Sequence, residues 1–180
     1  MRVLYVVEVV VDALPAGSRL SAQAGGVSGV VEVLQARITS WGYPPHCHDT
    51  WAVRVVDDGA IDYRLDRRRR QACRGTVTIL PPDITHDGHP ATAGNSFSKR
   101  KVYLSADFLP PSLYGPAVDH TNLTDPNLAT TVRQLHTALL CPGDRERSRT
   151  FVMRAPQEPS RAPCPVAGPA RGTLGTSRLP

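Results

Sequence analysis

Motifs that mark several large enzyme classes are missing from this sequence. It contains no G-x-S-x-G nucleophile motif, no glycine-rich phosphate-binding loop and no paired catalytic carboxylates. Serine hydrolases, P-loop nucleotide enzymes and hydrolases that use two carboxylates therefore have no local signature here. We therefore expect no catalytic residues and predict a binding function instead.

Cysteine pairs and long apolar runs are also missing. The four cysteines (Cys47, Cys73, Cys141 and Cys164) form no C-x-x-C pair and no dense disulfide pattern, so reduced thiols are the simplest interpretation. The run from Val3 to Val11 resembles a secretory signal, but Glu8 interrupts it and no clean cleavage pattern follows. No segment is long enough to span a bilayer. These absences predict a cytoplasmic protein with no membrane partner.

Positive charge is present but unevenly distributed. The net charge is +5, yet residues 142–180 contain seven arginines and three acidic residues, a net +4, so residues 1–141 carry only about +1. A nearly neutral folded part argues against a nucleic-acid-binding surface. Arg67 to Arg70 are predicted to be a solvated hairpin tip, and Ser98 to Lys101 a solvated start of a strand.

Turn-forming residues are abundant, with 17 prolines and 14 glycines in 180 residues, a length that suits one domain. Short β-branched or alternating segments recur about every ten residues. The clearest is 61–65, where Ile61, Tyr63 and Leu65 share a face after the Asp57-Asp58-Gly59 turn signal. Further strands are expected within residues 30–43, 51–56, 76–80 and 101–104; residues 3–11 are a strand or an arm, and residues 12–29 a loop. The pattern predicts a mainly β barrel or sandwich.

The pattern becomes helical near residue 125. Thr124 or Asp125 can cap a helix with Pro126 in its first turn, and Leu128, Val132, Leu135 and Leu139 form an apolar stripe. This stripe packs on the barrel or on a second copy of the chain. From about residue 148 Arg, Pro, Ser, Gly and Ala dominate, which predicts a disordered tail and suggests the hypothesis of a frameshifted or truncated gene. The predicted division is residues 1–29 as arm, 30–141 as barrel with one or two C-terminal helices, and 142–180 as tail.

Histidines form the main candidate site. His46 and His48, two apart in an extended segment, project to one face, while Cys47 between them points away and is not expected to be a nucleophile. His86 follows a second predicted strand through a proline-rich turn. An H-x-H pair with a distant third histidine is a weak signal for a metal site. The alternative is that the imidazoles bond to backbone groups at turns.

The spacing of these histidines resembles the two motifs of the cupin family. Gly42, His46, His48 and Gly59 fall on the first motif, and Gly75, Pro81 and His86 on the second, which implies a jelly-roll type barrel. The acidic ligand of the first motif is missing, because its place falls on Ala52 or Val53. We therefore expect no metal and no cofactor; if a metal binds, His46, His48 and His86 are its ligands.

A more specific resemblance is to the N-terminal domain of AraC-type transcription regulators. It is carried by the segment 44–51 (PPHCHDTW), the Asp58-Gly59 turn and the segment 80–88 (LPPDITHDG), and it covers residues 35–140. The resemblance implies a pocket for a small-molecule effector, lined by His46, His48, Trp51, Tyr63 and His86. Aromatic faces with neutral imidazoles suit a sugar or a small aromatic or polar metabolite. His89, His120 and His136 are expected to be structural.

The resemblance also implies partners and competing functions. Helices after the barrel dimerise in this family, so a second copy or a full-length relative is the expected protein partner. The family's helix-turn-helix half has no counterpart in residues 142–180, so no independent specific DNA binding is expected. The leading hypothesis is an effector-sensing domain and not an enzyme. A small metal-dependent cupin enzyme, an isomerase or dioxygenase, is the main alternative, and a carbohydrate-binding module is a third.

Overall fold

The computed structural model describes residues 15–140 of the chain. Within this range the chain forms ten strands, a short 3-10 helix and two α-helices. They are β1 (Arg19–Ala24), β2 (Val30–Thr39), β3 (Tyr43–His46), β4 (Trp51–Asp58), β5 (Ala60–Leu65), β6 (Arg68–Cys73), β7 (Val77–Leu80), β8 (His86–Pro90), β9 (Ser96–Leu104), η1 (Pro111–Leu113), α2 (Tyr114–Asp119), β10 (Asn122–Leu123) and α3 (Pro126–Leu140). The mainly β prediction with one or two following helices is confirmed.

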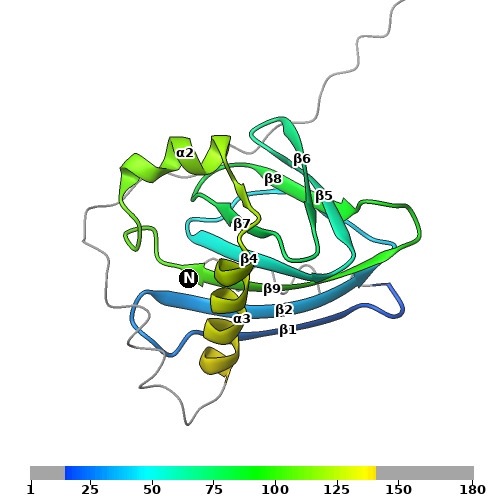
Figure 1. Ribbon diagram of the computed structural model, residues 1–180, viewed down its shortest axis with the longest axis horizontal. Coiled ribbons are helices and arrows are strands. Elements are labelled where there is room, and N and C mark those ends of the chain that lie inside the picture. Colours follow the sequence, from blue (N-terminus) through cyan, green and yellow to red (C-terminus); the bar gives the residue numbers. More distant parts are fainter. Residues whose placement is uncertain (1–14, 141–180) are drawn as a thin grey trace, which may run out of the picture.

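The strands form two antiparallel sheets that enclose a common interior (Figure 1). The larger sheet has the order β1-β2-β9-β4-β7-β10, and the smaller sheet has the order β3-β8-β5-β6. Strand β9 is central in the larger sheet: its Val102 lies opposite Val33 of β2 on one side and opposite Val53 of β4 on the other. Residues that face inward from β9 therefore lie in the middle of the barrel.

Apolar side chains from both sheets fill most of the interior. The inward-facing cluster includes Ile38, Ile61, Tyr63, Leu65, Leu80 and Phe97, each at most 1% exposed. The expected alternation of Ile61, Tyr63 and Leu65 is confirmed, because the three residues face this core together. Burial of this much apolar surface is the main stabilising contribution to the barrel.

Helix α3 covers the outer face of the larger sheet (Figure 1). Its Leu139 packs with Val33, Trp51 and Val102, and its Val132 packs with other outward residues of the same sheet. The helix begins as expected, because Asp125 Oδ1 accepts the backbone N–H of Asn127 at 2.8 Å. The sequence allowed the apolar stripe to pack either on the barrel or on a second copy of the chain. In the structure it packs on its own barrel.

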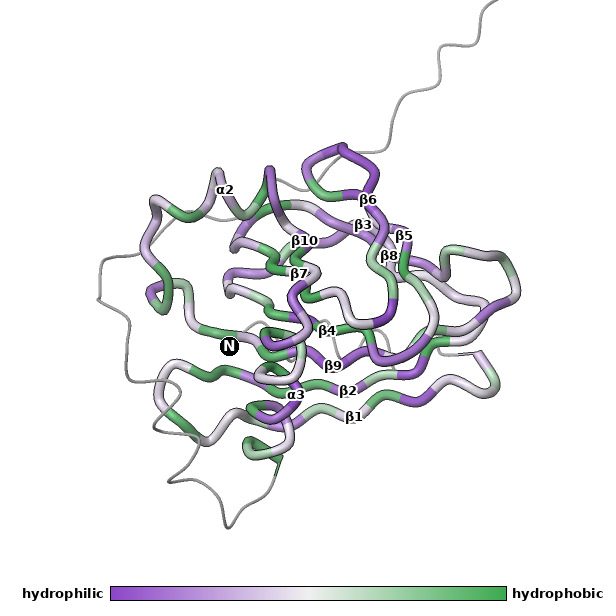
Figure 2. The backbone as a smooth tube through the Cα atoms, in the orientation of Figure 1, coloured by the Kyte–Doolittle hydropathy of each residue, from purple (hydrophilic) through white to green (hydrophobic). Residues whose placement is uncertain are grey.

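The turn at Gly59 has a steric cause. Gly59 has φ +71°, and a Cβ at this position would collide with the backbone of Ser96 and Phe97. Only glycine adopts this left-handed conformation without strain while the hairpin lies against β9. The tip of the next hairpin, between β5 and β6, is among the most hydrophilic parts of the described chain, as expected for its arginines (Figure 2).

One secondary-structure prediction is wrong. Residues 19–24, predicted as loop, form β1, which pairs with β2 along its whole length from Arg19 opposite Arg37 to Ala24 opposite Glu32. The predictions for residues 1–14 and for the tail from residue 141 fall outside the described residues. In residues 15–140 no helix has the length and hydropathy needed to cross a membrane.

Candidate functional site

Three histidines meet at one end of the smaller sheet. His46 ends β3 and lies opposite His86, the first residue of β8, while His48 follows β3 in the connection to β4. The ring centroids of His46 and His86 are 4.4 Å apart, and those of His48 and His86 are 4.9 Å apart. The two sequence motifs are therefore brought together by the pairing of β3 with β8.

Each of these imidazoles is oriented by a backbone carbonyl. The Nδ1 atoms lie 2.7 Å from Pro44 O for His46, 2.8 Å from Thr50 O for His48 and 3.0 Å from Ile84 O for His86. A carbonyl oxygen only accepts, so Nδ1 carries the proton and Nε2 is left as an acceptor. The Nε2 atoms of His48 and His86 are buried and have no partner among the described residues.

These histidines are neutral near pH 7. Burial, followed by the nearby Lys101 ammonium, lowers the pKa of His46 from 6.5 to about 4. Burial also places the pKa of His48 and of His86 well below the ordinary value, with Lys101 contributing to His48 and the neighbouring imidazoles to His86. The cluster is therefore a set of neutral hydrogen-bonding groups.

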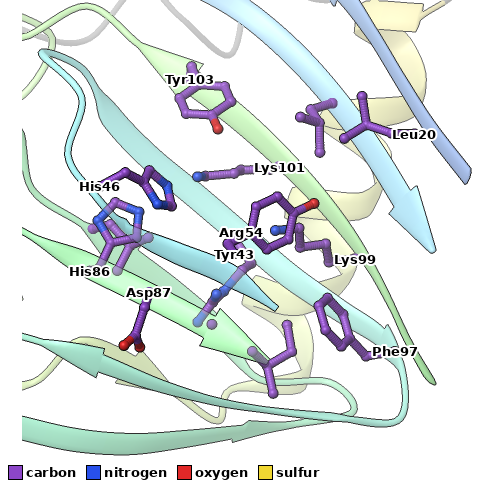
Figure 3. Close-up of a pocket in the computed structure, with 14 residues that line it drawn as sticks. Leu20, Tyr43, His46, Arg54, His86, Asp87, Phe97, Lys99, Lys101 and Tyr103 are labelled. Carbon is purple, nitrogen blue, oxygen red and sulfur yellow. The ribbon is translucent and has the colours of Figure 1, made fainter. Parts of the chain in front are cut away.

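Three cationic side chains enter the barrel from the larger sheet. On β9 the residues Phe97, Lys99, Lys101 and Tyr103 alternate onto the inward face, and Arg54 does the same on β4. Lys99, Lys101 and Arg54 are only 6%, 4% and 3% exposed. Figure 3 shows Lys101 extending toward His46, with Arg54 and Lys99 beside Tyr43. The prediction that Lys99 and Lys101 are solvated is wrong.

Aromatic rings surround these cations. Lys99 Nζ lies 3.9 Å from the centroid of the Tyr43 ring, Lys101 Nζ 4.3 Å from that of Tyr103, and Arg54 Cζ 4.5 Å from that of Tyr63. Cation–π contacts of this kind partly replace hydration of a buried positive charge. They do not neutralise it.

Carboxylates neutralise little of the positive charge in this interior. The ion pairs found within residues 15–140 include none formed by Lys99, Lys101 or Arg54. Glu32 is also buried, on β2, but its Oε1 atom has no hydrogen-bond partner in the described chain. Burial lowers the pKa of Lys101 from 10.5 to about 7 and raises the pKa of Glu32 from 4.5 to about 7. Burial likewise lowers the pKa of Lys99 well below its ordinary value.

These groups surround a small cavity of about 20 Å³, room for about one water molecule. Its polar lining is contributed by Tyr43, His46, Arg54, His86, Asp87, Lys99, Lys101 and Tyr103, and its apolar lining includes Leu20, Leu34, Ile61, Leu80 and Phe97. Asp87 is already engaged, since its Oδ2 accepts from Arg64 Nε at 2.7 Å. A ligand larger than water therefore enters only when side chains move, and the flexible lysine stems are the most adaptable of them.

The donor set does not fit a metal ion. No group of three His, Cys, Asp or Glu side chains that could hold a metal occurs among residues 15–140. Ala52 faces the interior at the place where the cupin motif has its acidic ligand, and Lys101 adds positive charge beside the imidazoles. A divalent cation would meet neutral ligands and an adjacent ammonium group.

The predicted pocket residues separate into three groups. His46 and His86 line the cavity, and His48 packs behind them against His86 and Tyr103. Tyr63 lies inside the barrel, but its hydroxyl donates to Asn122 Oδ1 at 2.7 Å and its ring contacts Arg54. Trp51 does not line the cavity: it faces outward under α3 and contacts Tyr114, so its assignment to the pocket is wrong.

Sequence reasoning missed the cationic residues of the site. Arg54, Lys99 and Lys101 were overlooked because charged residues on strands usually face solvent. A signal was nevertheless present, since Lys99 and Lys101 alternate in register with Phe97 and Tyr103.

The other predicted features lie away from the cavity. His89 and His120 are exposed, and His136 on α3 is buried with Nε2 3.0 Å from Leu34 O. Cys73 is free and exposed, and Cys141 and Cys164 lie outside the described residues.

Residues 28–155 match the model of the family described as AraC-like ligand binding domain. No curated protein matches the sequence.

Similar solved structures include several cupin domains. The Cnp3 cupin domain of Schizosaccharomyces pombe is 7% identical, with 51% of this chain and 67% of that chain covered and a TM-score of 0.44. A cupin 2 conserved barrel domain protein from Leptotrichia buccalis is 16% identical, with 53% and 46% covered and a TM-score of 0.44. The bacterial pirin YhhW from Escherichia coli, solved with nickel(II), is 17% identical, with 44% and 37% covered and a TM-score of 0.42.

Proposed function

Because the chain belongs to the AraC-like ligand-binding domain family, we propose that its barrel binds a small-molecule effector and thereby regulates transcription. The observation that carries this proposal is a set of buried polar atoms without partners beside the cavity. It comprises Tyr43 OH, Arg54 Nε and the Nε2 atoms of His48 and His86. Buried polar groups are normally satisfied, so an unpaired set around one cavity points to a ligand that completes it.

The proposed signal leaves the barrel through β9. This strand carries Lys99 and Lys101 on its inner face and Arg100 on its outer face. Arg100 donates to Asp57 Oδ2 at 2.8 Å and to Thr137 Oγ1 on α3 at 3.1 Å. A displacement of β9 by a ligand would thus be felt at α3. We infer that α3 is the element whose position reports occupancy of the barrel.

The protein partners belong to the same proposal. We propose dimerisation with a second copy or with a full-length relative, in the cytoplasm. In residues 15–140 the α-helices are α2 and α3, which are separated by β10 and form no helix-turn-helix unit. Specific DNA recognition is therefore not assigned to this part of the chain, and no catalytic step is assigned to it.

A thermal-shift screen of the full chain with sugars and small aromatic acids tests effector binding, since a ligand of the native state raises Tm. We expect at least one class to raise Tm in the wild type and to lose this effect in His46→Ala combined with His86→Ala. The matched control is His120→Ala, an exposed histidine away from the cavity. An unchanged shift in the double variant would place the ligand elsewhere.

Elemental analysis tests the enzyme alternative. We expect less than stoichiometric transition metal in protein purified without a histidine tag, both before and after incubation with nickel(II) or iron(II). A stoichiometric metal lost in His86→Ala would favour the metal-dependent enzyme over the sensor.

A further inference from the structure

We propose that the effector is a small carboxylate, whose negative group is bound inside the barrel by Lys99, Lys101 and Arg54. This inference rests on the proposed function, namely that the barrel binds a small molecule. It adds the chemical class of that molecule and the residues that select it.

The distribution of the two basic residue types is the first argument. The chain has 19 arginines but only two lysines, and both lysines are buried in the barrel on adjacent inward positions of β9. Burying a lysine without a carboxylate partner is costly, because the ammonium loses its hydration. Both lysines border the same cavity, next to Arg54, so this desolvation cost arises twice at one place in the fold.

The charge balance of the interior is the second argument. Lys99 and Lys101 come from β9, Arg54 from β4 and the carboxyl group of Glu32 from β2, while Asp87, the carboxylate that lines the cavity, is already paired with Arg64. The imidazoles of His46, His48 and His86 are neutral, and the tyrosine hydroxyls of Tyr43 and Tyr103 carry no charge near pH 7. Burial and the neighbouring basic groups lower the pKa of Lys99 and of Lys101, so these amines give up protons readily in the empty barrel, and an anion entering the cavity would favour their protonated forms.

The arrangement favours a carboxylate over the other ligand classes considered. A neutral sugar would bring no negative charge to the three basic groups, and a metal ion would be repelled by those that are protonated. The guanidinium of Arg54 has a buried Nε–H without a partner, and a planar carboxylate matches the fork of arginine. The accepting Nε2 of His86 suits a hydroxyl on the same ligand.

The remaining lining describes the body of the ligand. Phe97, Leu34, Leu80 and Ile61 supply apolar walls, and Tyr43 stands between Lys99 and His46. The free volume is only about 20 Å³ before side chains move. The ligand is therefore small, with a compact apolar or aromatic body attached to its carboxylate.

Matched pairs of probes test the charge requirement on the full chain. Benzoate with benzamide, hexanoate with hexanamide and galacturonate with galactose are each titrated at constant ionic strength, by thermal shift and by calorimetry. Inorganic phosphate is titrated in parallel. We expect at least one carboxylate to bind while its neutral counterpart does not, and phosphate alone to bind more weakly than that carboxylate.

Three variants locate the effect. Lys99→Met and Lys101→Met keep the stems and remove the charges, and each is expected to weaken carboxylate binding by about tenfold or more. Arg37→Met removes one positive charge from an exposed position on β2 and is expected to leave binding unchanged. Selective isotope labelling of lysine gives two side-chain NMR signals in the wild type and one in each lysine variant; these signals also show that each variant is folded, and they should move when the carboxylate binds.

The outcomes separate the two proposals. Binding of galactose or benzamide as tightly as of their carboxylates overturns the carboxylate assignment and leaves effector sensing intact. Phosphate binding without carboxylate binding overturns it as well, as does an equal loss of affinity in Arg37→Met and Lys101→Met. If no probe binds at all, the sensing function falls together with this inference.

Discussion

Glu32 and Lys101 lie on neighbouring strands inside the barrel and do not form an ion pair. Glu32 is opposite Tyr103 and Lys101 is opposite Leu34, so the two charged side chains are diagonal neighbours, and Glu32 Oε1 has no partner in the described chain. Desolvation by burial brings both groups to a pKa of about 7. The empty barrel is thus poised so that small changes in pH or ligand alter its internal charge.

Removing the Lys101 charge is expected to stabilise the empty protein. In Lys101→Met the stem is retained and the desolvation cost disappears, so the free energy of unfolding at pH 7 should rise by about 1–4 kcal/mol. Denaturant unfolding of wild type and variant measures this difference.

The difference in unfolding free energy between wild type and Lys101→Met should depend on pH, and the sign of this dependence follows from the pKa of Lys101. The folded pKa of Lys101, about 7, is below its unfolded value of 10.5, so between these values the unfolded state binds more protons. Wild-type stability should therefore rise with pH between about 7 and 10.5, and the advantage of Lys101→Met should shrink over that range. An advantage that stays constant from pH 7 to 10 would contradict the assignment of a buried ammonium.

The histidine cluster is expected to limit stability in acid. The folded pKa of His46 is about 4 and its unfolded value 6.5, so the unfolded state gains protons first as pH falls through this range. Stability is complete above pH 6.5 and is lost toward pH 4, by up to about 1.4 kcal/mol per pH unit for each histidine. The free energy of unfolding, measured between pH 4 and 7, should depend less on pH for His46→Gln with His86→Gln than for wild type.

Trp51→Phe tests the correction of the predicted pocket. Trp51 is fully buried under α3, its ring centroid lies 4.9 Å from that of Tyr114, and its Nε1–H donates to Ala106 O at 3.2 Å. The substitution should cost about 1–3 kcal/mol of stability while leaving effector affinity within about twofold. Loss of binding without loss of stability would return Trp51 to the binding site. Tyr43→Leu, which alters the cavity wall, should by contrast weaken effector binding by more than twofold.

Asp57 is expected to hold α3 on the sheet. Its Oδ1 accepts from Arg133 Nε on α3 and its Oδ2 from Arg100 Nε on β9, both at 2.8 Å. Asp57→Asn should destabilise the docking of α3 by about 1–3 kcal/mol, seen as faster amide hydrogen exchange in residues 129–139. Arg68→Gln, which breaks the exposed pair with Asp119, is the control and should cost less than about 0.5 kcal/mol.

Sequence patterns predicted the parts of the fold that local chemistry dictates. The Asp57-Asp58-Gly59 turn and the Asp125 cap were found because each depends on one or two residues with special backbone preferences. Strand β1 was missed, because Arg19–Ala24 is rich in small and polar residues and becomes a strand only by pairing with β2. Pairing partners distant in sequence leave little trace in such a segment.

The site was predicted only in part for a similar reason. The two histidine motifs named His46 and His86 as site residues, and the pairing of β3 with β8 in the structure brings them together. Trp51 could not be placed, because both faces of β4 are buried, one in the barrel and the other under α3. A local pattern gives the alternation of side chains but not which buried face is the cavity.

The confinement of both lysines to the barrel has a practical consequence for amine chemistry. Acylating reagents and lysine acetylation act on accessible, unprotonated amines, and this chain offers no lysine side chain on its surface. Modification of Lys99 and Lys101 therefore requires the barrel to open. The rate at which an amine-reactive label modifies these two residues therefore measures how often the barrel opens, and a bound anion should lower that rate.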